Sequence, residues 1–259
     1  MTEVTDIGVR INEINGRAKW SLPTAALLSL AICNAGAEAQ ANSVFSPEWT
    51  GIYLGGSIGA RKDVIDWTAL TAGSLSGSDA KASVESHAAR VGVFSGVNFQ
   101  LGTVVLGVEG DLGWGKNSGL GIKRLVGFPS GPDDRMDIDT SVDGSLRLRA
   151  GVLVLPTLLL YGTGGIAYQQ LDITAKCTAA GPWCVANRVD QVSSNRTGVT
   201  LGGGLETLLL NKFVARVEYR WTGYGAQDVA LFSGGGVDAI KAQLDQSSHV
   251  VMVGVAYKF

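Results

Sequence analysis

Eight segments of the chain alternate between apolar and polar side chains with the period of two that is typical of β-strands. In the segment 212–224, Phe213 and Trp221 fall on an apolar row, and Arg216 and Glu218 fall on the opposite row. After residue 49, no segment shows the pattern of an amphipathic helix. The predicted strands cover residues 49–60, 87–100, 103–115, 140–155, 157–171, 195–210, 212–224 and 247–259.

The connections between these segments alternate in length. Three are tight turns, in the sequences FQLGT, LPT and LNK. The other four are polar and cover roughly residues 61–86, 116–139, 172–194 and 225–246. Long connections on one side and short turns on the other are typical of a barrel inserted from one side of a membrane. The pattern therefore predicts an all-β, eight-stranded antiparallel up-and-down transmembrane β-barrel with four long extracellular loops and three short periplasmic turns.

Two orientations of the side-chain rows have to be weighed. In a soluble barrel the apolar rows would fill the interior, whereas in a membrane barrel they face lipid and the charged rows line the lumen. The membrane orientation is favoured by the unequal connections and by aromatic residues near strand ends, which resemble the aromatic girdles of membrane barrels. These residues are Trp49, Trp114, Trp221, Tyr224, Tyr257 and Phe259.

On the membrane interpretation, a set of charged residues faces the lumen. Charges in a narrow interior have to be paired, because an isolated buried ion is very costly. We expect ion pairs from segment 103–115 to 140–155 and from 195–210 to 212–224, acting either as a plug or as a gate with exchangeable partners. The expected lumen network comprises Arg90, Glu109, Asp111, Arg147, Arg149, Arg196, Glu206, Arg216, Glu218, Arg220 and Lys258.

Composition agrees with a β-rich protein that does not bind nucleic acid. The 259 residues include 36 glycines, 46% hydrophobic residues and 17% charged residues, with a net charge of −2. Nucleic-acid-binding proteins usually carry a basic excess, which is missing here. No run of 18 or more apolar residues occurs, so no transmembrane helix is predicted.

The N-terminal region has the features of a secretory signal peptide. Basic residues precede a short apolar core at 25–32, which is followed by small residues at A-x-A spacing. We expect residues 1–41 to be the signal peptide, with cleavage after Ala41 or alternatively after Ala37 or Ala39, and residues 42–259 to form the barrel. The alternative is a short amphipathic helix. Export would allow Cys177 and Cys184 to form a disulfide, although two free thiols would fit as well.

Several motifs, taken together, resemble a known family. They are WTGIYLGGSIGA at 49–60, LLLYGTGGIAY at 158–168, GGGLE at 202–206, VEYRWTGYG at 217–225 and the final VGVAYKF. In order and spacing the chain resembles the small eight-stranded outer-membrane β-barrel proteins of Gram-negative bacteria, in particular the alphaproteobacterial outer-membrane immunogenic and porin-family surface proteins.

The resemblance implies residence in the cell outer membrane, contact with outer-membrane lipid and lipopolysaccharide, and insertion by the barrel-assembly machinery. In such proteins a terminal aromatic after alternating apolar residues is the assembly signal, here Tyr257 and Phe259. We expect a structural or surface-interaction role, antigen-like or adhesin-like, with an extracellular ligand bound through the loops.

The alternatives are a small-solute channel and a barrel that binds haem or another ligand. Neither a catalytic residue nor a cofactor or metal site is predicted. His249 and the neighbouring Ser247 fall on the lipid-facing row, and His87 lies near a strand edge.

Overall fold

The computed structural model describes residues 48–72, 81–115, 121–122, 135–177, 187–210, 212–231 and 240–259. Within these ranges the chain forms β-strands joined by turns. The strands are β1 (Gly51–Ala72), β2 (Lys81–Leu101), β3 (Val104–Trp114), β4 (Gly121–Ile122), β5 (Arg135–Leu155), β6 (Leu158–Cys177), β7 (Arg188–Leu209), β8 (Phe213–Leu231) and β9 (Ile240–Lys258).

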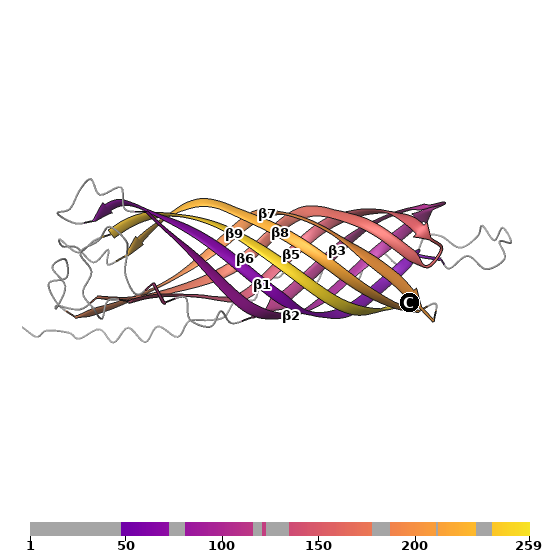
Figure 1. Ribbon diagram of the computed structural model, residues 1–259, viewed down its shortest axis with the longest axis horizontal. Helices are drawn as coiled ribbons and strands as arrows, with labels where there is room; N and C mark the ends of the chain where they lie inside the picture. Colours follow the sequence, from indigo (N-terminus) through magenta and orange to yellow (C-terminus); the bar gives the residue numbers. More distant parts are fainter. Residues whose placement is uncertain are drawn as a thin grey trace, which may run out of the picture. The chain divides into compact units, whose positions relative to one another are not determined.

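Eight antiparallel strands close into a ring, which confirms the predicted architecture (Figure 1). The order runs β3-β2-β1-β9-β8-β7-β6-β5, and β3 pairs with β5 to complete the ring, while the two-residue β4 adds to the edge of β5. The C-terminal strand is the closing strand, because β9 pairs with β1 from Tyr53 opposite Lys258 to Ala72 opposite Ile240. At the end where the C-terminus lies, Gly102 adopts a positive φ of 64° in the turn between β2 and β3.

The strands are much longer than the sequence pattern predicted. β1 and β7 each have 22 residues, and β8 and β9 each have 19. Most of the residues assigned to four long polar loops therefore belong to strands, and that part of the prediction was wrong. Spanning a bilayer core takes only about 9–11 tilted residues per strand. About half of each long strand thus continues beyond the membrane on the side away from the C-terminus.

The strand lengths were underestimated because the apolar and polar side-chain rows exchange faces where the strands leave the membrane. Along β1, Ile52 and Ile58 are exposed on the outer face, whereas farther along it is Asp66 that is exposed there. The inner face changes in the opposite sense, from buried Arg61 to fully buried Trp67. A polar outer row and an apolar inner row are the arrangement of a soluble protein. The outer part of each strand consequently resembles a polar loop when only the membrane pattern is sought.

Beyond the membrane the wall of the ring divides into two sheets. The pairing of β3 with β2 and β5 ends at Trp114, and the pairing of β7 with β8 ends at Val199 and Gly223. The extensions of β2, β1, β9 and β8 remain paired with one another, as do those of β5, β6 and β7. We call these extensions the extracellular head. Their inward-facing apolar side chains are buried: Ile65, Trp67, Leu171, Ile173, Ala175, Val229, Ala242 and Leu244.

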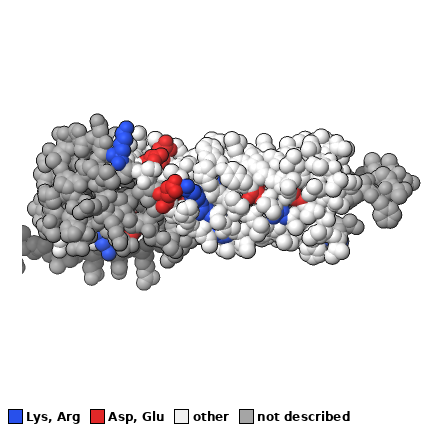
Figure 2. All heavy atoms as spheres, viewed as in Figure 1, with Lys and Arg blue, Asp and Glu red and all other residues white. Residues whose placement is uncertain are grey.

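An apolar belt surrounds the ring on the side of the C-terminus. It includes outward-facing Leu54, Val93, Leu148, Leu201 and Val253, which are 46–68% exposed. Figure 2 shows this part of the described surface as mostly uncharged, with the larger charged groups gathered toward the head. Within the described residues, no helix is long and apolar enough to cross a membrane.

The predicted aromatic girdle needs two corrections, of which the first is that Tyr224 is half-buried and lies near the aspartate cluster described below. Trp114, Trp221 and Phe259 are exposed on the outer face, as a girdle requires, but Trp49 is only 1% exposed. The indole nitrogen of Trp49 donates to the Pro156 carbonyl oxygen at 3.1 Å, and its backbone N–H donates to the Gln100 side chain. Trp49 therefore packs inside the end of the ring instead of facing lipid.

Candidate functional site

The lumen of the barrel is filled by side chains in successive layers. At the periplasmic end, the one holding the C-terminus, a mainly apolar cluster closes the interior. Its buried members are Trp49, Tyr53, Phe94, Val105, Leu159, Tyr161, Leu208, Val214 and Ala256. Because these residues come from strands all around the ring, the cluster forms a plug across the lumen and not a lining along one wall.

The next layer is a cluster of three arginines and three glutamates, which we call the glutamate cluster: Arg147, Arg149, Arg216, Glu109, Glu206 and Glu218. All six side chains are at most 3% exposed. Arg147 joins Glu109 at 2.5 Å to Glu218 at 2.6 Å, and so links β3, β5 and β8. Since Glu109 also pairs with Arg216 at 2.6 Å, the ion pairs cross the lumen as well as following the wall.

Two tyrosines attach the glutamate cluster to the periplasmic plug. The Tyr53 hydroxyl donates to Glu109 at 2.8 Å, and the Tyr161 hydroxyl donates to Glu218 at 2.8 Å. The Arg149 guanidinium lies against the Tyr161 ring, 4.4 Å from its centroid, and donates to the Tyr53 hydroxyl. Hydrogen bonds and cation–π contacts thus satisfy these buried groups.

Nearer the cell exterior lies a second cluster, of three arginines and three aspartates: Arg61, Arg90, Arg220, Asp63, Asp111 and Asp143. In this aspartate cluster Arg90 bridges Asp111 at 2.6 Å and Asp143 at 2.7 Å. Arg220 pairs with Asp111 at 2.8 Å, and Arg61 pairs with Asp63 at 3.1 Å. A contact of 3.6 Å from Arg147 to Asp111 joins the two clusters.

Each cluster is electrically balanced, with three cations against three anions. Buried charges are tolerated when they are paired and hydrogen-bonded, whereas one left without a partner is strongly destabilising. The two clusters therefore fill the middle of the lumen with a set of charges that need no mobile counter-ion.

Inward-facing glycines provide the space for these large side chains. A Cβ atom at Gly96 would lie 2.4 Å from the Tyr53 hydroxyl oxygen and 2.6 Å from the Val108 carbonyl oxygen. At Gly113 it would lie 2.2 Å from the Arg90 guanidinium carbon. The high glycine content thus contributes directly to the packing of the lumen.

Outward of the aspartate cluster the lumen is polar but mostly uncharged. The side chain of Gln246 donates to Gln169 at 3.2 Å, and Gln169 donates to Thr140 at 2.8 Å. Thr222 donates to Thr200 at 3.0 Å. Buried Ser86 and Ser248 flank Asp63 on the neighbouring strands, so amides and hydroxyls continue from the aspartate cluster toward the apolar interior of the head.

All but two of the residues predicted for the lumen network meet in the two clusters. For the other two residues, the prediction of an ion pair in the lumen was wrong. Lys258 is half-buried at the periplasmic rim, where its ammonium donates to the Glu48 carbonyl oxygen. The inner row beside Lys258 is apolar, so this residue lies outside both clusters. Arg196 is buried but has no carboxylate within ion-pair distance among the described residues. Its neighbour β8 has separated from β7 by that level.

Sequence reasoning also missed members of the clusters. Arg61 and Asp63 lie in a range that was assigned to a loop. Asp143 shares the inward row with Arg147 and Arg149, and Tyr53 belongs to the inward row of β1, so row parity alone could have found both. Their chemistry was visible in the sequence, but their distant partners were not.

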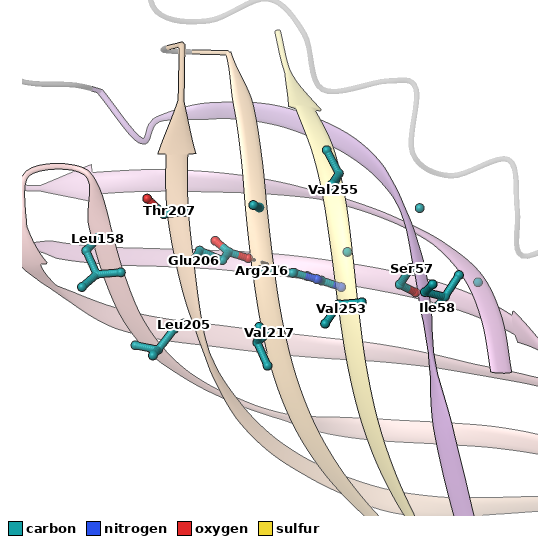
Figure 3. A pocket seen from close by; sticks show the side chains of 14 residues that line it. Ser57, Ile58, Leu158, Leu205, Glu206, Thr207, Arg216, Val217, Val253 and Val255 are labelled. Atoms are coloured by element: carbon teal, nitrogen blue, oxygen red, sulfur yellow. Dashed lines mark ion pairs between the residues drawn. The ribbon is translucent and has the colours of Figure 1, made fainter. Parts of the chain in front are cut away.

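The outer wall has a shallow groove of about 790 Å³ in the apolar belt (Figure 3). Small residues at Gly56, Ala215 and Gly254 thin the wall there, and the larger side chains around them are apolar, including Leu205 and Val253. Glu206 and Arg216 lie behind it with an ion-pair contact of 3.7 Å. Because the groove opens outward within the belt, it faces the hydrocarbon chains of the membrane.

Metal-binding or catalytic groups are not gathered in the described part of the chain. Among those residues no three His, Cys, Asp or Glu side chains are placed to hold a metal ion. His87 is exposed on the outer face of β2, and the His249 Nδ1 atom lies 2.8 Å from the Tyr219 hydroxyl on the same outer surface. Cys177 ends β6, but Cys184 lies outside the described residues, so the disulfide remains a prediction.

A closed ring with a lipid-facing apolar belt and charges inside defines a transmembrane β-barrel. The family model for the outer membrane protein β-barrel domain matches residues 25–259, and the chain belongs to that family. It is 33% identical to the 25 kDa outer-membrane immunogenic protein of Brucella abortus over 82% of this chain and 78% of that protein. It is 30% identical to the 22 kDa outer membrane protein of Rhizobium leguminosarum bv. viciae, with the same coverage.

Among solved structures, one that the chain matches is the outer membrane protein OprG from Pseudomonas aeruginosa. The TM-score is 0.48, with 13% sequence identity over 81% of this chain and 96% of that chain. The family membership and the named relatives place the protein in the outer membrane, as the sequence predicted. The printed names of these relatives describe outer-membrane proteins and none of them names an enzyme.

Proposed function

We propose that this protein is a closed scaffold that presents an extracellular head and its connecting loops for interaction at the cell surface. The observation that carries the proposal is the filling of the lumen by two charge-balanced clusters above an apolar plug. A barrel of eight strands has an interior just wide enough for side chains. A lumen that is packed in this way supports a structural role over transport.

The long strands support the surface role. The head has its own buried interior and a polar outer face, which are the features of a water-exposed structure. The described strand ends on this side lie opposite the end that holds the C-terminus: Ala72 pairs with Ile240, Cys177 with Arg188 and Leu231 with Ile240. Contact with lipopolysaccharide and with an extracellular ligand belongs to the same proposal, because both meet the molecule at this end.

Site-specific labelling on intact cells tests the surface role. In a background with Cys177→Ser and Cys184→Ser, we expect Ala226→Cys to react with a membrane-impermeant maleimide, because Ala226 is exposed on the outer face of the head. The matched control is Lys212→Cys, which is exposed in a turn at the opposite end and should react only after the cells are lysed. Equal labelling of both sites on intact cells would contradict the proposed orientation.

Planar-bilayer recording tests the closed lumen. The folded protein, verified by its heat-dependent shift in gel migration, should give no conductance steps above the lipid baseline. Discrete steps from folded protein would show that the ion pairs open and would support the channel alternative instead.

A further inference from the structure

Among the described residues, one buried cation of the lumen is left over when the charges are paired. The glutamate and aspartate clusters use six arginines and six acids, and Arg196 is a seventh arginine that belongs to neither. Arg196 is only 2% exposed. An arginine stays protonated in proteins, so it cannot avoid the cost of burial by losing its proton.

The contacts of Arg196 leave one edge of its guanidinium group unused. Its Nη1 atom donates to the Leu244 carbonyl oxygen at 3.4 Å, which is a long and therefore weak bond. The Nε and Nη2 atoms have no protein partner among the described residues. These two atoms form the edge of the guanidinium from which two parallel N–H groups point, and this edge matches two oxygens of a carboxylate or phosphate.

Other polar groups at this level also have unused hydrogen-bonding capacity. The Gln246 Oε1 atom and the Ser248 hydroxyl, both on the inner face of β9, are buried without a partner in the described part of the chain. Gln169 connects Gln246 to the layer of Arg196, because it lies opposite Arg196 on β6 and accepts a hydrogen bond from Gln246, and Ser248 follows Gln246 on the same face of β9. Buried polar groups are normally satisfied, and unsatisfied ones are explained by a bound water molecule or ion.

The backbone pairing of the wall is interrupted beside this layer. The pairing of β7 with β8 ends at Val199 and Gly223, so Arg196 lies immediately beyond the last paired residues. Strand β8 bends away at an irregularity between Gly223 and Gly225, where Gly225 adopts a positive φ of 68°. The break lies on the head side of the apolar belt, where the outer face of β7 becomes polar.

We propose that Arg196 is the centre of an oxyanion-binding site inside the base of the head, which takes a carboxylate or phosphate group. The Nε and Nη2 atoms bind two oxygens of the anion, and the Ser248 hydroxyl donates to one of them. The Gln246 Oε1 atom accepts a hydrogen bond from a hydroxyl of the ligand or from a water molecule that accompanies it. The anion balances the positive charge of Arg196, which forms no ion pair with the described residues.

Thermal unfolding and titration calorimetry test this site. The folded full-length mature protein in dodecyl maltoside is titrated with sodium acetate and, separately, with sodium phosphate, at constant ionic strength set by chloride. We expect a saturable rise in the melting temperature with at least one of the two oxyanions. Arg196→Gln should weaken binding by at least about tenfold, because it removes the charged two-pronged donor.

The variants also make the result independent of a folding defect. Without oxyanion, Arg196→Gln should melt at or above the temperature of the unchanged protein, because it removes a buried charge that has no partner. In saturating oxyanion that order should reverse. Lys241→Gln makes the same charge change at an exposed position on the outer face of β9 and should leave binding unchanged.

Three outcomes would overturn the proposal. They are the absence of saturable binding of either oxyanion to the unchanged protein, equal stabilisation by chloride alone, and unaltered binding in Arg196→Gln. If Arg196→Gln does not fold, Arg196→Lys replaces it. Lysine keeps the charge but lacks the planar pair of donors, so it should still weaken oxyanion binding, and full affinity in that variant would also refute the site.

Discussion

Replacing Glu218 with glutamine tests whether the balanced charges of the lumen stabilise the barrel. Glu218 is fully buried and accepts hydrogen bonds from Arg147 at 2.6 Å and from Tyr161 at 2.8 Å. The substitution keeps the shape of the side chain but leaves the glutamate cluster with three arginines and two glutamates. Removing one partner of a buried ion pair typically costs about 3–5 kcal/mol.

We therefore expect Glu218→Gln to lower the free energy of unfolding by about 3 kcal/mol, a change of more than a hundredfold in the unfolding equilibrium. The measurement is urea-induced unfolding of the barrel in lipid vesicles, followed by tryptophan fluorescence and by the fraction of the folded band on a gel. Asp228→Asn, at an exposed position on the head, is the control and should change stability by less than about 0.5 kcal/mol.

A double variant separates charge balance from packing. Arg147→Met together with Glu218→Gln leaves two arginines and two glutamates in the glutamate cluster, so its charge is balanced again. We expect the double variant to lose about 2 kcal/mol less than the sum of the two single losses, since directly contacting residues couple by up to about 3 kcal/mol. If Glu218→Gln is as stable as the unchanged protein, or if the losses simply add, the balance of charge does not stabilise the lumen.

Three further predictions concern packing, the disulfide and assembly. Gly96→Ala should destabilise the barrel in the same urea assay, because its methyl group would overlap the Tyr53 hydroxyl, whereas Gly56→Ala on the open outer face should be neutral or slightly stabilising. Reductant should slow the gel migration of heat-denatured protein if Cys177 and Cys184 are linked, and an identical migration with and without reductant would argue for free thiols. Deleting Phe259, which is 73% exposed at the end of the chain, should reduce the amount of folded barrel in cells while leaving refolding in detergent unimpaired; normal assembly in cells would exclude it as the signal.

The membrane part of the fold could be predicted from the sequence because lipid imposes a simple rule on it. Every second residue faces hydrocarbon and must be apolar, as in Val251, Val253 and Val255 of the closing strand. The same alternation placed Glu109 and Arg147 on inward rows, and the structure sets them directly opposite each other. Which arginine pairs with which acid across the lumen depends on strand register, and the alternation alone does not specify register.

The head could not be predicted in this way because its strands follow the opposite rule. On β9 the outward row changes from valines to Asp245 and Lys241, while the inward row, which carries the polar Ser248 and Gln246 in between, ends in Leu244 and Ala242. The period of two continues, but the apolar residues move to the other row. Arg196 was likewise placed on the correct row, and only the separation of β8 from β7 explains why it has no acidic partner.

The length of the strands determines how far from the lipid the protein meets other molecules. β1 has 22 residues, which at about 3.3 Å per residue and a tilt of about 40° rise roughly 55 Å along the barrel axis. An apolar band about 25 Å tall uses less than half of that rise. The strand tips are thus held on the order of 30 Å above the hydrocarbon, so that a large partner could dock on them without having to approach the lipid headgroups.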